Sequence, residues 1–142
     1  MINPKDIVIL DTHVWIWLLT GGKKLENSGC LAHIENAAKY GNIRVSAISV
    51  WEVGMLEAKG RIKFPVECID WINKALSVPG VSLVPLTPEI AVESSQLPDK
   101  FHGDPADRII VASARKLGAT LITHDKEIIS YGRKMFVKVI PV

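Results

Sequence analysis

The stretch DIVILDTHVWIWLL, residues 6–19, joins an apolar strand to an apolar helix through a single aspartate, Asp11. Residues 6–10 predict a short strand of the kind that parallel sheets bury on both faces. Thr12 is a residue type that caps helices, and a glycine pair at residues 21–22 ends the helical pattern. The stretch therefore predicts the first strand and the first helix of an α/β unit.

The rest of the chain alternates strands and helices in the same way. Its 142 residues, 48% apolar and 23% charged, are typical of one globular domain. Alternation of this kind indicates βαβ units, so the sequence predicts a single domain over residues 1–142 with three α/β/α layers and a central, mainly parallel sheet. Further strands are expected over residues 43–48, 81–86, 120–123 and 136–140, and further helices over residues 28–40, 49–59, 66–76, 88–96, 104–117 and 125–131.

Composition excludes several classes of protein. No apolar run approaches the roughly 18 residues of a membrane span, and no secretory signal pattern opens the sequence. The two cysteines form no paired motif, which favours a reduced compartment, so we expect a cytoplasmic protein without membrane contact. The net charge is only +2, but residues 52–107 carry nine acidic and five basic groups, whereas residues 108–142 carry two and seven. An acidic region beside a basic surface suits a cation-dependent enzyme acting on a polyanion.

Four carboxylates lie where a purely structural role is unexpected. Asp11 directly follows the first predicted strand, and Asp125 follows the strand at residues 120–123 after one residue. Glu52 and Asp107 lie in the first turns of predicted helices beside apolar neighbours. A buried carboxylate is costly unless it finds a cation or becomes protonated. Strand carboxyl ends and the helix N-termini that follow them share one edge of a parallel sheet, where such sheets bind ligands. We therefore expect all four acids at that edge.

Each acid also has a simpler interpretation, because helix N-termini favour negative charge. In the DPAD sequence, Asp104 is the better helix cap and Asp107 the better candidate ligand, although both can serve. Oxygen ligands without paired Cys or His spacing favour Mg²⁺ or Mn²⁺ over zinc. The predicted metal ligands are Asp11, Glu52, Asp104, Asp107 and Asp125.

Several other polar residues are candidates for supporting the acids or contacting a substrate. Hydroxyl groups at the same edge can orient carboxylates or bind phosphate oxygens, with helix capping as the simpler alternative. Histidines flank the acids without zinc-ligand spacing, and neither GxGxxG nor GxxxxGK[ST] occurs, which disfavours dinucleotide or nucleoside-triphosphate binding. The supporting or substrate-contacting set is Thr12, His13, Ser49, Arg108 and Thr123.

Four segments resemble, in order along the chain, the motifs of the PIN-domain ribonucleases, most closely the VapC-type toxins of bacterial toxin–antitoxin pairs. The segments are Leu10–Val14, Ser49–Val53, Asp104–Ile110 and Thr123–Asp125. Each motif is weakly specific, but the four together cover essentially the whole chain. The resemblance implies a Rossmann-like fold, a Mg²⁺- or Mn²⁺-dependent endoribonuclease, a homodimer, and an antitoxin whose C-terminal segment covers the acidic groove.

By position, the resemblance assigns the family's first three acids to Asp11, Glu52 and Asp107. Asp125 falls near a fourth acid that varies between family members. These four are the predicted catalytic residues, for hydrolysis of RNA by a water that a divalent ion activates. Operator DNA is expected to be bound only through the antitoxin.

Basic residues of the C-terminal third, among them Arg115, are expected to hold the RNA backbone.

Other interpretations remain open from the sequence. A catalytically silent PIN-like binding module would keep the fold without the reaction. A phosphoacceptor receiver-type domain would need a lysine at the end of a late strand, and Lys138 lies inside one. An HD-type phosphohydrolase would be helical throughout, which the strand predicted over residues 120–123 disfavours.

Overall fold

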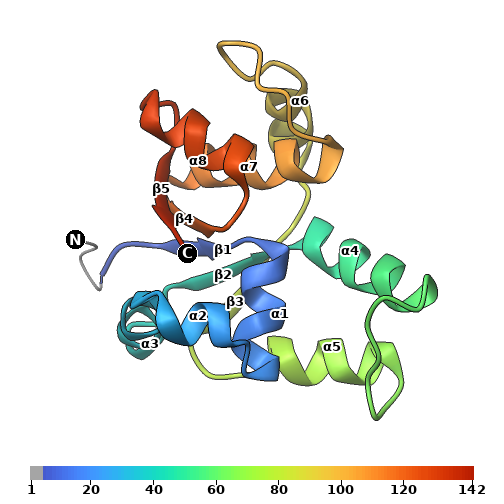
Figure 1. The fold of residues 1–142 in the computed structure, drawn as a ribbon. Coiled ribbons are helices and arrows are strands. Elements are labelled where there is room, and N and C mark those ends of the chain that lie inside the picture. The colour runs from blue at the N-terminus through green and yellow to red at the C-terminus, as the bar shows by residue number, and fades with distance from the viewer. Residues whose placement is uncertain (1–4) are drawn as a thin grey trace.

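A computed structural model describes residues 5–142 as an α/β fold built on one sheet. All neighbouring strands pair in parallel, in the order β3-β2-β1-β4-β5 (Figure 1). The predicted fold class is therefore confirmed. The strands are β1 (Val8–Leu10), β2 (Ile43–Ser46), β3 (Val81–Val84), β4 (Thr120–Thr123) and β5 (Lys138–Pro141), and the helices are α1 (Thr12–Thr20), α2 (Lys23–Asn27), α3 (Cys30–Lys39), α4 (Ala47–Ala58), α5 (Cys68–Leu76), α6 (Pro88–Ser95), α7 (Pro105–Leu117) and α8 (Lys126–Arg133).

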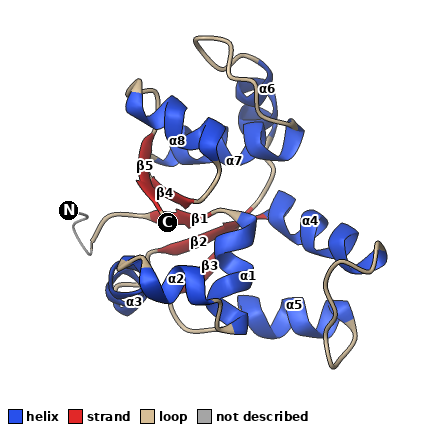
Figure 2. Ribbon diagram, in the orientation of Figure 1, coloured by secondary structure: helices blue, strands red, loops and turns tan. Residues whose placement is uncertain are grey.

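Helices cover both faces of the sheet, as Figure 2 shows. Helices α1, α2, α3 and α5 lie on one face, and α6, α7 and α8 lie on the other (Figure 1). Successive residues of a strand point to opposite faces, so β1 contributes Val8 and Leu10 to one hydrophobic cluster and Ile9 to the other. Both faces of β1 are buried, which explains its apolar sequence.

Helix α4 begins earlier than the sequence predicts. Ser46 ends β2 and its Oγ accepts a hydrogen bond from the Ile48 amide at 3.2 Å, so it caps α4 in place of Ser49. Glu52 therefore lies in the second turn of α4, and the prediction that it lies in the first turn is wrong. The interpretation of Thr12 as a cap is also wrong, because the Asp11 side chain caps α1.

The remaining elements agree with the predictions except for one helix. The short helix α2 is not in the predicted pattern, because its five residues give too little periodicity. The other boundaries differ from the predicted ones by two residues or fewer. Within residues 5–142, no helix is long and apolar enough to cross a membrane.

Candidate active site and metal centre

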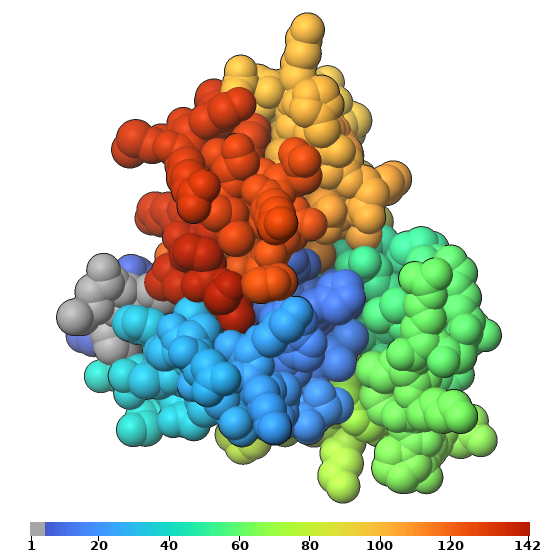
Figure 3. All heavy atoms as spheres, viewed as in Figure 1, coloured from blue at the N-terminus to red at the C-terminus, as the bar shows by residue number. Residues whose placement is uncertain are grey.

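A hollow of about 490 Å³ opens at the carboxyl edge of the sheet, and we call it the acidic hollow. The N-terminal, middle and C-terminal parts of the chain meet at the centre of the molecule in the space-filling view (Figure 3). Helices α1, α4, α7 and α8 all contribute to the hollow or begin beside it. Its lining residues are Asp11, His13, Trp17, Glu52, Asp104, Asp107, His124, Asp125, Lys126 and Glu127.

The carboxylate of Asp11 is buried and held at both oxygens. Its Oδ1 accepts a hydrogen bond from the Thr12 amide at 2.8 Å, and its Oδ2 accepts one from Thr123 Oγ1 at 2.6 Å. Burial raises the pKa of Asp11 above its ordinary value, although both hydrogen bonds act in the opposite direction. The donors therefore fix the direction in which this carboxylate faces the hollow.

Thr12 connects Asp11 to Glu52. The Thr12 hydroxyl donates to Glu52 Oε1 at 2.5 Å, and its oxygen lies 2.8 Å from the Ser49 Oγ. Burial raises the pKa of Glu52, with the Thr12 hydrogen bond opposing the shift and the charge of Asp11 adding to it. The predicted hydroxyl residues Thr12 and Thr123 thus bond directly to acids, whereas Ser49 contacts Thr12.

The carboxyl group of Asp107 also has a raised pKa. Desolvation raises its pKa to about 7, and the charges of Asp104, Asp11, Asp125 and Glu52 add to the shift. The acidic hollow is lined by six carboxylates, including that of Glu127, and by one lysine, Lys126. A bound cation would relieve this repulsion.

Three of these acids also cap helices, as the simpler interpretation predicted. Asp11 caps α1, as described above, and the other two are Asp104 and Asp125. Asp104 Oδ1 accepts from the Asp107 amide at 2.8 Å and begins α7, while Asp125 Oδ1 accepts from the Ile128 amide at 3.0 Å and begins α8. Asp104 and Asp125 each keep a second carboxylate oxygen that accepts no hydrogen bond from residues 5–142. Capping and a place in the acidic hollow are therefore compatible.

The donor set fits a hard divalent cation. Between residues 5 and 142, no three acidic, imidazole or thiol groups are arranged closely enough to ligate one metal ion as they stand. Mg²⁺ usually binds through one or two carboxylates and keeps several waters, so it does not need a complete protein cage. The carboxylate chemistry and the raised pKa of Asp107 both favour such an ion.

The two arginines predicted to contact substrate lie outside the acidic hollow. Arg108 donates from Nε to the Ser94 carbonyl at 2.8 Å and from Nη1 to the Phe101 carbonyl at 2.5 Å. It therefore fastens α7 to the end of α6 and the following loop, and the substrate role is not supported. Arg115 donates to the Phe136 carbonyl and lies 3.5 Å from Glu93, at the end of α7 remote from the acids.

The receiver-type alternative also disagrees with the geometry. Lys138 is the first residue of β5, so it lies at the opposite edge of the sheet from the carboxylates. There it lines a separate cavity of about 790 Å³ together with Arg115. No lysine stands at the carboxyl end of β5. Lys126 lines the acidic hollow, but it is the first residue of α8 and not the end of a strand.

Three lining residues of the acidic hollow, namely Trp17, Lys126 and Glu127, are not among the residues predicted from the sequence. In the sequence, Trp17 lies among the other apolar residues of the first predicted helix, so nothing in its immediate surroundings distinguishes it from a core residue. Its spacing of four residues from His13 places both on one helix face, and this was the available signal. His102, which also flanks the acids in sequence, is exposed and does not line the hollow.

A parallel sheet between two helical layers, with carboxylates gathered at its carboxyl edge, defines an α/β protein with an acidic edge site. The PIN domain family matches residues 8–134, and the chain belongs to this family. The predicted membership, first indicated by four short motifs, is confirmed.

Relatives and solved structures agree with this assignment. Ribonuclease VapC22 of Mycobacterium tuberculosis is 34% identical over 124 residues, which cover 87% of this chain and 91% of the relative. A similar fold occurs in the crystal structure of VapBC2 from Rickettsia felis bound to a DNA fragment from their promoter. One chain of that structure superposes with a TM-score of 0.68 at 18% identity, and the alignment covers 95% of this chain and 98% of the other. For DNA-bound VapBC from Salmonella typhimurium, the TM-score is 0.66 at 14% identity, with 95% and 97% covered.

Proposed function

We propose that the chain is an endoribonuclease and the toxin of a toxin–antitoxin pair. The observation that carries the proposal is the group of acids that share the acidic hollow, with the pKa of Asp107 raised to about 7. Such a site suits a reaction at a phosphodiester, where negative charge must be offset. The relative that is named a ribonuclease supports the choice of RNA as substrate.

The cofactor in this proposal is Mg²⁺ or Mn²⁺, held by Asp11, Glu52 and Asp107 together with Asp104 or Asp125. When bound, such an ion supplies a water that ionises near neutral pH and positive charge for the phosphate oxygens. The protein's own contribution is orientation, because Thr12 and Thr123 hold the carboxylate oxygens of Asp11 and Glu52 in place. Burial of Asp11 excludes water from behind the reacting groups.

The decisive experiment is incubation of purified protein with a panel of hairpin and unpaired RNAs in Mn²⁺, with and without a chelator. We expect cleavage that leaves 5′-phosphate and 3′-hydroxyl ends and that stops when the chelator is added. Cleavage that continues in the chelator, or 2′,3′-cyclic phosphate ends, contradicts the mechanism. A catalytically silent binding module would bind these RNAs or a protein partner and cleave none of them.

The proposed partners are an antitoxin protein and a second copy of this chain, with operator DNA bound only through the antitoxin. Solved structures with this fold are VapBC toxin–antitoxin complexes, which supports an antitoxin partner. RNA and antitoxin would both meet the protein in the cytoplasm. Light scattering of the purified chain is expected to show a dimer, and a monomer throughout the micromolar range would contradict the homodimer. Specific operator binding by this chain alone would contradict the assignment of DNA binding to the antitoxin.

A further inference from the structure

Three aromatic side chains form one side of the acidic hollow beside the carboxylates. His13 and Trp17 lie on α1, and His124 follows β4. The His13 and Trp17 ring centroids are 6.2 Å apart with planes tilted by 55°, and the Trp17 and His124 centroids are 5.6 Å apart in an edge-to-face contact of 69°. We call this group the aromatic wall. It is not needed to hold a metal ion, so its place in the hollow requires another explanation.

The aromatic wall is held rigidly by its surroundings. A Cβ atom at Gly22 would lie 2.8 Å from Trp17 Cβ and 2.9 Å from Trp17 Cγ, so only glycine allows the chain to approach the indole so closely. The indole also packs against the larger hydrophobic cluster. On the other side, His124 Nδ1 donates to the Val142 carbonyl at 2.9 Å. A preformed aromatic surface loses little conformational entropy when a ligand binds to it.

Two lysines bring positive charge to the aromatic wall. Lys24 Nζ lies 5.4 Å from the centroid of the Trp17 indole, in a cation–π arrangement, and Lys126 lines the acidic hollow. The carboxylates of the hollow repel the phosphates of an approaching RNA. A nucleotide next to the cleaved bond therefore needs contacts that these carboxylates do not weaken. Stacking of an uncharged base on an aromatic ring is such a contact, and a nearby ammonium can pair with the adjoining phosphate.

We propose that the aromatic wall is a nucleobase subsite, in which an unpaired base next to the scissile phosphate stacks on Trp17. His13 and His124 border the stacked base. The Lys24 ammonium, which lies over the indole in the free chain, moves from the ring to a flanking phosphate when the base stacks. This inference rests on the proposed endoribonuclease function and adds to it the residues that place the RNA. A base inside a duplex has to be unpaired and unstacked before it can reach Trp17, which costs free energy, so we expect the cleaved bond to lie in an unpaired segment.

The first test compares Trp17→Leu and Trp17→Phe with the native chain. Leucine retains an apolar contact with the core and removes the ring, whereas phenylalanine retains a smaller ring. With a short unpaired RNA that the native protein cleaves at one mapped bond, we expect Trp17→Leu to raise KM by about 5- to 150-fold with a smaller change in kcat. Trp17→Phe should recover a large part of the loss. The matched control is Trp51→Leu, which changes an exposed tryptophan outside the acidic hollow and should leave KM unchanged.

The second test identifies the base. Each nucleotide near the mapped bond is replaced in turn by an abasic one, and binding is measured with Asp11→Asn protein so that no cleavage occurs. We expect one position at which base removal weakens binding to the protein with Trp17 and has no effect on the protein that also carries Trp17→Leu. A purely structural Trp17 would not produce this dependence on a single base.

The outcomes separate the inference from the function on which it rests. Unchanged KM in Trp17→Leu, or equal sensitivity to every abasic position with and without Trp17, overturns the nucleobase subsite while leaving the endoribonuclease intact. A native chain that neither cleaves nor binds any RNA overturns both. If Trp17→Leu lowers the melting temperature, His13→Ala, which changes an exposed side chain of the same wall, is expected to raise KM without affecting folding. Unchanged KM in a folded His13→Ala protein and in Trp17→Phe would then overturn the subsite.

Discussion

Asp11→Asn is expected to lower kcat/KM for RNA cleavage by about a thousandfold or more while the protein remains folded. Asp11 presents two acceptor oxygens to the Thr12 amide and the Thr123 hydroxyl, and asparagine can present only one. Its amide nitrogen would face a donor, and the negative charge that favours a divalent cation would be lost. Cleavage kinetics in Mn²⁺ measure the effect, and circular dichroism reports folding. Any growth arrest that the native chain causes on expression should also disappear.

The control for this prediction is Asp70→Asn. Asp70 is an exposed acid in the first turn of α5 and does not line the acidic hollow. Its replacement removes the same charge from the chain, so cleavage should stay within a factor of about two of the native rate, as for an ordinary surface substitution. Equal activity in Asp11→Asn and the native chain would show that the acidic hollow is not the active site.

The second large effect concerns pH in the absence of divalent ions. The pKa of Asp107 is about 7 in the folded chain against an ordinary value of 3.8, and the pKa values of Asp11 and Glu52 are raised as well. At pH values between about 4 and about 7, the carboxyl group of Asp107 is therefore protonated in the folded state and ionised in the unfolded state. The free energy of unfolding therefore decreases as the pH rises from about 4 to about 7.

Asp107→Asn removes the carboxyl group whose pKa is raised to about 7. At about pH 8 without metal, we expect the variant to be about 1–2 kcal/mol more stable than the native chain, after allowance for solvent screening of a half-buried group, with a melting temperature about 3–6 °C higher. Near pH 4 the two proteins should differ little. Adding Mg²⁺ or Mn²⁺ at the higher pH should stabilise the native chain more than the variant. Thermal melts at the two pH values, with and without metal, measure this, and a native melting temperature that is unchanged by metal would contradict the proposed ion site.

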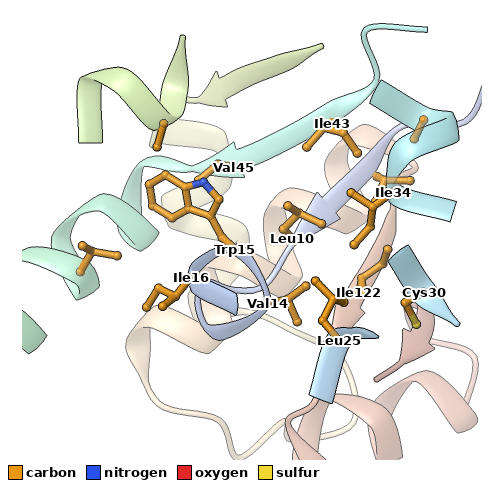
Figure 4. Packing of buried hydrophobic residues seen from close by; sticks show 14 of the residues in the cluster. Leu10, Val14, Trp15, Ile16, Leu25, Cys30, Ile34, Ile43, Val45 and Ile122 are labelled. Atoms are coloured by element: carbon orange, nitrogen blue, oxygen red, sulfur yellow. The ribbon is translucent and has the colours of Figure 1, made fainter. Parts of the chain in front are cut away.

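The fold could be predicted from the sequence because its strongest signals are local. The apolar run before Asp11 and the apolar residues before Asp125 mark two buried strands, and parallel pairing brings their carboxyl ends to one edge. Figure 4 shows how Trp15, among Leu10, Ile16 and Val45, completes the packing of α1 on that sheet. Periodicity of this kind is visible in a single sequence.

The remaining features depend on contacts between distant segments. Arg108 is adjacent to a predicted ligand, but its guanidinium reaches carbonyls of residues 94 and 101, a choice set by the path of the loop after α6. Ser46 and Ser49 are both good caps, and only the end of β2 decides between them. Trp17 turns one side to the core and one to the acidic hollow, which its apolar character alone could not reveal.

The amide of Asp11 donates to the Ile122 carbonyl at 3.0 Å, continuing the pairing between β1 and β4 beyond the end of the strand. Strand β1 is central in the sheet, with a partner on each side. Amides in such a position exchange with solvent only when the sheet itself opens, on the timescale of global unfolding. The first acid of the site is therefore part of the slowest-exchanging core of the domain. Local opening that spares the sheet therefore leaves Asp11 in place, whereas the acids at the starts of α7 and α8 depend on those helix ends.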